Sequence, residues 1–168
     1  MTIFPVINIT ARRKTARLMA SLCGLFCLLT TGTAVALEQY TAHGGPVKHL
    51  TLSPDGSLMV SSSFDYSAVV WSVPELADEA TLIGHDAAVN VAMFTPDGDW
   101  LVTGGDDNQI LLWSVADILS LGDETTPFVL RGHYGKIVDF AFSADGRYLV
   151  SASWDGIVGL WDMALARN

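Results

Sequence analysis

Short apolar segments alternate with polar turns along residues 37–168, and the same order of segments occurs three times. In each copy an apolar strand leads into an Asp-Gly turn, and a second apolar strand follows. A third strand ends at a tryptophan, and a more polar fourth strand precedes the next copy. Alternating segments with turn residues at fixed offsets are typical of antiparallel hairpins. The first strands are predicted at Val47–Leu52, Val89–Phe94 and Ile137–Phe142, the second at Leu58–Ser61, Trp100–Thr103 and Tyr148–Ser151, the third at Ala68–Trp71, Ile110–Trp113 and Ile157–Trp161, and the fourth at Ala80–Ile83 and Phe128–Arg131.

Each copy also carries four residues at one fixed spacing. A histidine is followed 22 residues later by an aspartate and 28 residues later by a tryptophan, and a serine or threonine stands four residues before the aspartate. Three occurrences of this spacing identify a repeat protein. The twelve residues are His43, Ser61, Asp65, Trp71, His85, Thr103, Asp107, Trp113, His133, Ser151, Asp155 and Trp161.

Four antiparallel strands in each copy, at periods of 42 and 48 residues, predict one β-propeller blade per repeat. The expected fold class is all-β, with three four-stranded repeats in an incomplete ring, because closed propellers typically have about four to eight blades. The repeats are expected at about 37–78, 79–126 and 127–168. The longer period places a surface insertion with one helical turn before His133. The third blade lacks an outer strand, whereas Leu37–Thr41 forms one with no preceding blade.

Several dipeptides connect these repeats with a known family. Gly84-His85 and Gly132-His133 open two copies and Trp161-Asp162 closes the third, whereas Ala42-His43, Trp71-Ser72 and Trp113-Ser114 keep part of the pattern. The chain resembles the WD-repeat family. Its sequence is similar to those of exported bacterial propellers. The resemblance implies a hydrogen-bonded tetrad of histidine, serine or threonine, aspartate and tryptophan in each blade. Buried polar groups need such partners, and three identical copies favour a structural role over a catalytic triad.

The resemblance also implies a binding face. Partners of such propellers usually dock where the turn before the tetrad aspartate meets the start of the first strand. Phe64 and Trp154 stand out there, because a turn gives an aromatic ring no core to enter and exposed aromatics are frequent interface anchors. The alternative is that each ring packs over its neighbouring blade. By position, the face contains Pro46, Lys48, Phe64, Ala88, Asn90, Asp106, Lys136, Val138 and Trp154.

The first 36 residues differ in composition from the repeats. A basic start that includes Arg12 and Arg13 precedes an apolar run from Leu18 to Leu29, and Ala34-Val35-Ala36 has the pattern of a cleavage site. This order is typical of a secretory signal peptide, so residues 1–36 are predicted to be removed and the protein to be periplasmic or extracellular. Both cysteines would be removed with the peptide. The alternative is a membrane protein anchored by the uncleaved segment, although the strongly apolar part is short for a bilayer span.

Charge and motifs narrow the possible functions. The formal net charge is −9, and removal of the first 36 residues leaves five basic against 18 acidic residues, a net charge of −13. Such a surface repels phosphate backbones, so no nucleic-acid partner is expected. No haem, phosphate-loop or zinc motif is found, so no catalytic residue, metal or cofactor is expected. His49, outside the tetrads, is predicted to be a solvated or hydrogen-bonded strand residue.

These observations favour a non-catalytic protein–protein interaction scaffold with a protein partner. The alternative is an accessory propeller of a longer periplasmic redox protein linked to a c-type cytochrome, or of a hydrolytic protein, that is truncated here. The incomplete ring leaves a further possibility open. A homodimer would form a six-bladed ring in which the N-terminal strand of each copy pairs with the edge of the other.

Overall fold

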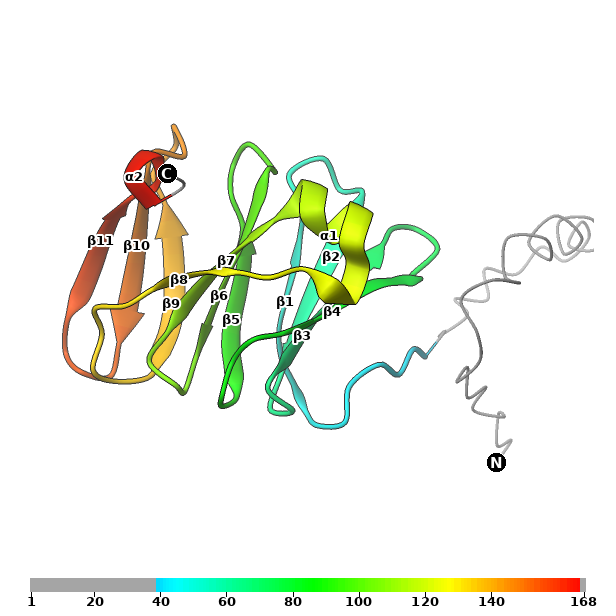
Figure 1. Cartoon of the computed structure of the whole chain (residues 1–168), viewed down its shortest axis with the longest axis horizontal. Coiled ribbons are helices and arrows are strands. Elements are labelled where there is room, and N and C mark those ends of the chain that lie inside the picture. Colours follow the sequence, from blue (N-terminus) through cyan, green and yellow to red (C-terminus); the bar gives the residue numbers. More distant parts are fainter. Residues whose placement is uncertain (1–38, 167–168) are drawn as a thin grey trace, which may run out of the picture. The chain divides into compact units, whose positions relative to one another are not determined.

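The computed structural model describes residues 39–166 (Figure 1). The chain divides into two units, Met1–Thr41 and Ala42–Asn168. In the first unit only residues 39–41 are described, and none of them lies in a strand, so the predicted outer strand Leu37–Thr41 is wrong for these three residues. An extended segment needs a neighbouring strand to bond its N–H and C=O groups, and residues 39–41 appear in no strand pair. Leu37, Glu38 and the predicted signal-peptide helix of residues 1–36 lie outside the described residues.

The second unit contains three antiparallel sheets, one from each repeat (Figure 1). We call them blades 1, 2 and 3, and in each the strands are hydrogen-bonded in chain order. Blade 1 consists of β1 (Val47–Leu52), β2 (Leu58–Ser63), β3 (Ser67–Ser72) and β4 (Asp78–Ile83), blade 2 of β5 (Val89–Phe94), β6 (Trp100–Gly105), β7 (Ile110–Ser114) and β8 (Phe128–Leu130), and blade 3 of β9 (Ile137–Phe142), β10 (Tyr148–Ser153) and β11 (Val158–Asp162).

The all-β fold of propeller-like blades is confirmed, and in residues 39–166 the third of the predicted four-stranded repeats lacks its outer strand, as expected from the sequence. Within the described residues, blade 3 has three strands, because a short helix, α2 (Met163–Ala166), directly follows β11. The first strands have the predicted bounds, and the second strands run two residues further than predicted.

Each hairpin between a first and a second strand is closed by the Asp-Gly turn seen in the sequence. In blade 1 the Ser53 Oγ donates to Asp55 Oδ1 at 2.6 Å and accepts the Leu58 N–H at 2.9 Å. Gly56 follows with a φ of 72°, in the left-handed region that glycine adopts without a steric penalty. The same serine or threonine, aspartate and glycine occur in the other two turns, so one local sequence sets the same hairpin three times.

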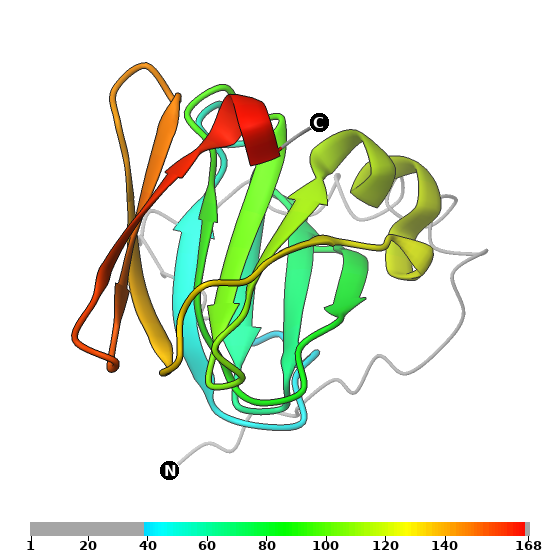
Figure 2. The ribbon, with the colours of Figure 1, turned by 60° about the vertical axis from the view of Figure 1, so that its left-hand side comes forward.

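The blades pack face to face, with β5 beside both β1 and β9 (Figure 2). Alternate residues of each strand point to opposite faces of its sheet, so blade 2 contributes one set of side chains to each neighbour. The first junction, between blades 1 and 2, buries Leu58, Val60, Ala68, Val70, Ala80, Leu82, Ala92, Phe94, Leu101, Leu111, Trp113 and Ile118. The second junction, between blades 2 and 3, buries Val91, Val102, Ile110, Leu112, Ile137, Phe140, Leu149 and Met163.

The insertion of the second repeat is larger than the predicted single helical turn. It forms α1 (Val115–Leu121) and a 3₁₀ turn, η2 (Gly122–Glu124). Ser114 caps the helix, because its Oγ accepts the Asp117 N–H at 3.2 Å. Ile118 is buried in the first junction, and Asp123 Oδ1 accepts the Thr81 N–H of β4 at 2.7 Å. The insertion therefore attaches blade 2 to the outer strand of blade 1.

Candidate functional site

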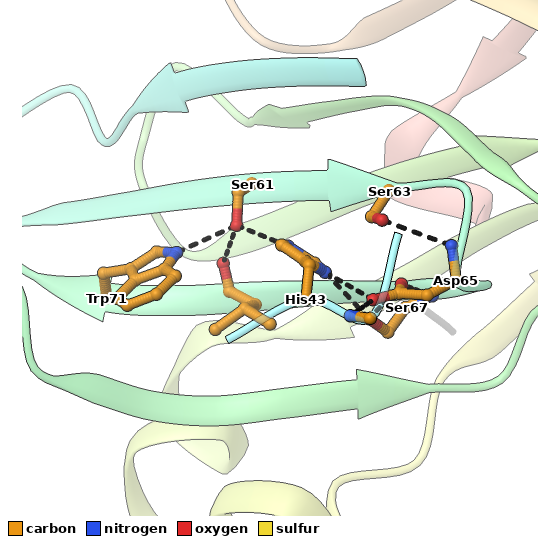
Figure 3. A network of polar contacts seen from close by, with 8 residues as sticks. His43, Ser61, Ser63, Asp65, Ser67 and Trp71 are labelled. Carbon is orange, nitrogen blue, oxygen red and sulfur yellow. Dashed lines mark hydrogen bonds and ion pairs between the residues drawn. The ribbon is translucent and has the colours of Figure 1, made fainter. Parts of the chain in front are cut away.

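In blade 1 the structure brings the four regularly spaced residues into one hydrogen-bonded chain (Figure 3). The Trp71 indole N–H donates to Ser61 Oγ at 2.9 Å. Ser61 Oγ lies 2.8 Å from His43 Nε2, and His43 Nδ1 lies 2.9 Å from Asp65 Oδ2. Ser61 is on β2 and Trp71 on β3, whereas His43 precedes β1 and Asp65 lies in the turn after β2. The chain therefore connects two strands and two loops of the blade.

The other two blades repeat this geometry. In blade 2, Thr103 Oγ1 accepts the Trp113 indole N–H at 3.0 Å and lies 2.9 Å from His85 Nε2. His85 Nδ1 is 2.8 Å from Asp107 Oδ2. The matching distances in blade 3 are 2.9 Å for Trp161–Ser151, 2.7 Å for His133–Ser151 and 2.8 Å for His133–Asp155.

The three aspartates are held in the ionised form. Burial opposes ionisation of Asp65, but hydrogen bonds from Ser67, the Gly44 N–H and His43 outweigh it and lower its pKa to about 2. Burial likewise opposes ionisation of Asp107 and Asp155. Hydrogen bonds from His85 to Asp107, and from backbone N–H groups to Asp155, overcome it and lower the pKa of both.

An ionised carboxylate fixes the direction of the hydrogen bonds. It can only accept, so each histidine donates from Nδ1, and in a neutral imidazole Nε2 is then the acceptor that faces the hydroxyl of the serine or threonine. That hydroxyl oxygen in turn accepts the indole N–H. Ser61, Thr103 and Ser151 are at most 2 % exposed. Although a hydroxyl, a histidine and an aspartate look like a catalytic triad, the oxygen is occupied by tryptophan and lies away from the surface.

A second set of residues lies where each first strand begins. The pairing register shifts once there in every blade, because Lys48, Asn90 and Val138 are extra residues opposite the second strand. Such a bulge locally redirects a side chain. The three bulge residues belong to the candidate binding face predicted from the sequence. We call the surface formed by its nine residues the turn face: Pro46, Lys48, Phe64, Ala88, Asn90, Asp106, Lys136, Val138 and Trp154.

Polar contacts cross the turn face from blade 1 to blade 3. The Lys48 ammonium donates to Asn90 Oδ1, and Asn90 Nδ2 donates to Asp106 Oδ1 at 2.7 Å and to the carbonyl of Ile137 at 2.8 Å. Lys136 Nζ donates to Asp106 Oδ2 at 2.5 Å. Burial opposes ionisation of Asp106, but the hydrogen bonds from Lys136 and Asn90 and the charges of both lysines lower its pKa.

An aromatic ring stands at each end of this network. Lys48 Nζ lies 4.3 Å from the centroid of the Phe64 ring, and Lys136 Nζ lies 5.4 Å from that of Trp154. These distances are within the range of cation–π contacts. Phe64 is 49 % exposed and Trp154 is 75 % exposed. Neither ring is covered by a neighbouring blade, which was the alternative considered for both.

Ala88 is the exception on the turn face. It is 4 % exposed, so its side chain is not available to a partner and its assignment to the face is wrong. Its side chain is a single methyl group that does not reach the surface, although its backbone is placed as in the other blades: the Ala88 carbonyl accepts the Asp106 N–H at 2.9 Å. The carbonyls of Pro46 and Lys136 accept the Phe64 and Trp154 N–H groups in the same way.

Two further aromatic residues next to tetrad residues were not selected from the sequence. Tyr134 follows His133 and is 86 % exposed, and Tyr66 follows Asp65 and is 52 % exposed. The Tyr134 N–H donates to Asp155 Oδ2, which places this residue beside the turn that carries Trp154. Both could have been identified from the sequence, because each directly follows a tetrad residue.

His49 differs from its prediction as a solvated or hydrogen-bonded strand residue. Its Nδ1 is buried and has no hydrogen-bond partner within the described residues. The same is true of the hydroxyl of Ser62, which is directly opposite His49 in the β1–β2 pairing. The bulge at Lys48 shifts this part of β1 relative to β2.

Two other kinds of site are absent from the described part of the chain. Residues 39–166 contain no group of three or more His, Cys, Asp or Glu side chains placed to hold a metal ion. No helix in the same range is long and apolar enough to cross a membrane.

Comparison with known protein families agrees with the repeat geometry. The model for the WD domain, G-beta repeat, matches residues 35–72, 78–114 and 124–162, which is more than half of the chain. The chain belongs to the WD40-repeat family. WD40 repeats generally bind protein partners, and this membership is consistent with a non-catalytic interaction scaffold.

Three curated WD40 relatives illustrate the similarity. Human transducin beta-like protein 3 is 40 % identical over 121 residues, and yeast (Saccharomyces cerevisiae) ribosome assembly protein 4 is 36 % identical over 133 residues. Each match covers 72 % of this chain but only 14 % and 22 % of the respective relative. The rice (Oryza sativa subsp. japonica) small ribosomal subunit protein RACK1y is 44 % identical over 39 residues, which are 23 % of this chain and 12 % of that protein.

These relatives contradict the predicted export. Their names describe a ribosome assembly protein and a ribosomal subunit protein of eukaryotes, not periplasmic or extracellular proteins. The prediction rested on residues 1–36, whose basic and apolar composition says nothing about the WD40 repeats that follow. The predicted bacterial type of protein and the anchored alternative have no support either.

Proposed function

We propose that this WD40-repeat chain is a non-catalytic scaffold that binds a protein partner on the turn face. The observation that carries the proposal is the pair of exposed rings, Phe64 and Trp154, at the two ends of a polar network that crosses three blades. Rings of this size bury a large apolar area with few rotatable bonds, and tryptophan is enriched among the residues that dominate binding energy.

The network supports the proposal because it orders the side chains before a partner arrives. Each lysine is held between a ring and a hydrogen-bond acceptor, Lys48 by Phe64 and Asn90, and Lys136 by Trp154 and Asp106. Ordering a long side chain on binding costs about 0.5–1.5 kcal/mol. Contacts already made in the free protein reduce this cost.

The tetrads have a different role in this proposal. They hold the turns that carry Phe64 and Trp154, because Asp65 and Asp155 follow these residues directly and are tied to His43 and His133. The position of each exposed ring therefore depends on the tetrad below it. The tetrad residues themselves make no contact with the partner.

The test is affinity capture from a lysate of the source organism with the full chain as bait. Phe64→Ala and Trp154→Ala are each expected to reduce the captured partner at least tenfold, with an unchanged far-UV circular dichroism spectrum. Phe128→Ala is the matched control for Phe64→Ala. Phe128 lies on β8 and is 52 % exposed, similar to Phe64. Equal capture by all three variants, or loss in the Phe128 variant alone, would show that the turn face is not the binding surface.

A further inference from the structure

The outer face of blade 1 carries apolar residues whose equivalents are buried elsewhere in the chain. Val47, Leu50 and Leu52 on β1 are 51 %, 58 % and 56 % exposed. The residues at the same positions of β5 and β9 face a neighbouring blade. Those equivalents are Val89, Ala92 and Phe94, which are at most 5 % exposed, and Ile137, Phe140 and Phe142, of which the first two are at most 4 % exposed.

The outer face of blade 3 likewise carries apolar residues whose equivalents are buried elsewhere in the chain. Val158 and Leu160 on β11 are 71 % and 68 % exposed. Their equivalents on β3 and β7 are at most 2 % exposed, because those strands pack against the next blade: Ala68 and Val70 in the first junction, Ile110 and Leu112 in the second. Each outer face is thus the unpaired half of a junction that forms twice within the chain.

The two junctions also show which positions must fit one another. A Cβ at Gly104 would lie 2.6 Å from Ile137 Cγ2 and 2.7 Å from Phe140 Cζ. Position 104 on β6 therefore faces position 140 on the next first strand, and it must be small where that residue is large. In the first junction the equivalent pair is Ser62 and Ala92, both of modest size.

On the outer faces the equivalent pair is Ala152 on β10 and Leu50 on β1, again a small residue and a larger one. Protein interiors tolerate different apolar residues at two facing positions when the summed volume of the two side chains is kept. Asp139, also on the outer face of blade 3, has His49 as its equivalent in the first junction, so that position accepts a polar residue.

We propose that the outer face of blade 3 binds the outer face of blade 1 of a second copy of this chain, so that two copies close a ring of six blades. The partner is fixed by the complementary pair of faces, each of which already packs against the other type inside the chain. A closed ring uses both faces of both copies, whereas a single copy exposes all of them. This inference concerns different surfaces from the turn face and does not rest on the proposed function.

The experiment measures the mass of the full chain in solution by size-exclusion chromatography with light scattering. The wild-type chain is expected at twice its 18.0 kDa mass. Leu50→Asp and Ala152→Lys each place one charge in both junctions of the ring, opposite an apolar residue. Each variant alone is therefore expected to be a monomer with an unchanged circular dichroism spectrum, since Leu50 is exposed and Ala152 is only half-buried in the single chain.

Mixing the two variants provides the decisive comparison. In a mixed dimer, one junction is wild type and the other pairs Asp at position 50 with Lys at position 152. A 1:1 mixture is expected to restore the dimer mass, and so is the double variant L50D/A152K. A monomeric wild type, a dimer that survives either single substitution, or a mixture that stays monomeric would overturn the proposal.

Discussion

Two adjacent serines on β2 separate the role of the tetrad from that of burial alone. Ser61 and Ser62 are 2 % and 0 % exposed, and replacement of either by alanine removes the same single oxygen atom. Ser61 Oγ contacts Trp71 Nε1 at 2.9 Å and His43 Nε2 at 2.8 Å, and the Val69 carbonyl at 3.5 Å. Ser62 Oγ has no partner within the described residues. The two substitutions are therefore matched in size, strand and burial, and differ in the hydrogen bonds that they remove.

The magnitude follows from the groups left behind. Ser61→Ala strands an indole N–H and an imidazole nitrogen, and each buried unsatisfied group costs about 1–3 kcal/mol. We expect Ser61→Ala to lower the free energy of unfolding by about 2–4 kcal/mol. Ser62→Ala removes a hydroxyl that was buried without compensation, so we expect it to be neutral or to raise that free energy by up to about 1 kcal/mol.

Urea unfolding followed by far-UV circular dichroism gives both values, because the unfolding free energy depends linearly on the urea concentration. Ser61→Thr is the control that keeps the hydroxyl, since blade 2 uses Thr103 at this position with the same contacts, and it should remain close to wild type. Equal effects of Ser61→Ala and Ser62→Ala would show that burial rather than the hydrogen-bonded chain decides the free energy of unfolding.

Three further predictions concern the same fold. Asp107→Ala should lower the free energy of unfolding by about 1–3 kcal/mol and Trp113→Ala by about 3–5 kcal/mol; unchanged thermal melts of both variants would contradict the tetrad's role. Gly104→Ala should lower the free energy of unfolding by about 1–3 kcal/mol, because the added Cβ would lie 2.6 Å from Ile137 of the next blade. Gly44→Ala is the control in the same urea titration and should change this free energy little, because its Cβ would lie 4.0 Å from the nearest atom. The folded-state pKa of Asp65 is about 2, below its usual 3.8, so the stability it adds is fully present above about pH 4 and is lost as the pH falls towards 2; a urea midpoint independent of pH across this window would count against it.

The strands and the tetrads were predictable from the sequence because both depend on local spacing. Alternation located β1, β5 and β9 with their observed bounds. A histidine, an aspartate and a tryptophan at one spacing in three copies indicated the tetrads, since three equivalent blades must place equivalent residues at the same point. These features repeat, so each copy supports the interpretation of the others.

What the sequence did not indicate depends on strand register, on turn packing and on contacts between repeats. The bulges at Lys48, Asn90 and Val138 arise from the register between two strands, which apolar alternation does not specify. Ala88 is buried although it makes the same backbone hydrogen bond as the equivalent Pro46 and Lys136, because its side chain is only a methyl group. The helix α1 was underestimated because Ile118 packs into a junction whose other half comes from blade 1.

We propose that a partner binds to the turn face, above the tetrads. Hydroxyl-radical footprinting of the captured complex tests it most directly, because exposed aromatic side chains are oxidised readily. We predict that Trp154 and Phe64 lose most of their oxidation when the partner is bound, while Phe128, away from the turn face, is oxidised as in the free chain. Protection of Phe128 together with unchanged oxidation of Trp154 and Phe64 would place the partner elsewhere on the protein.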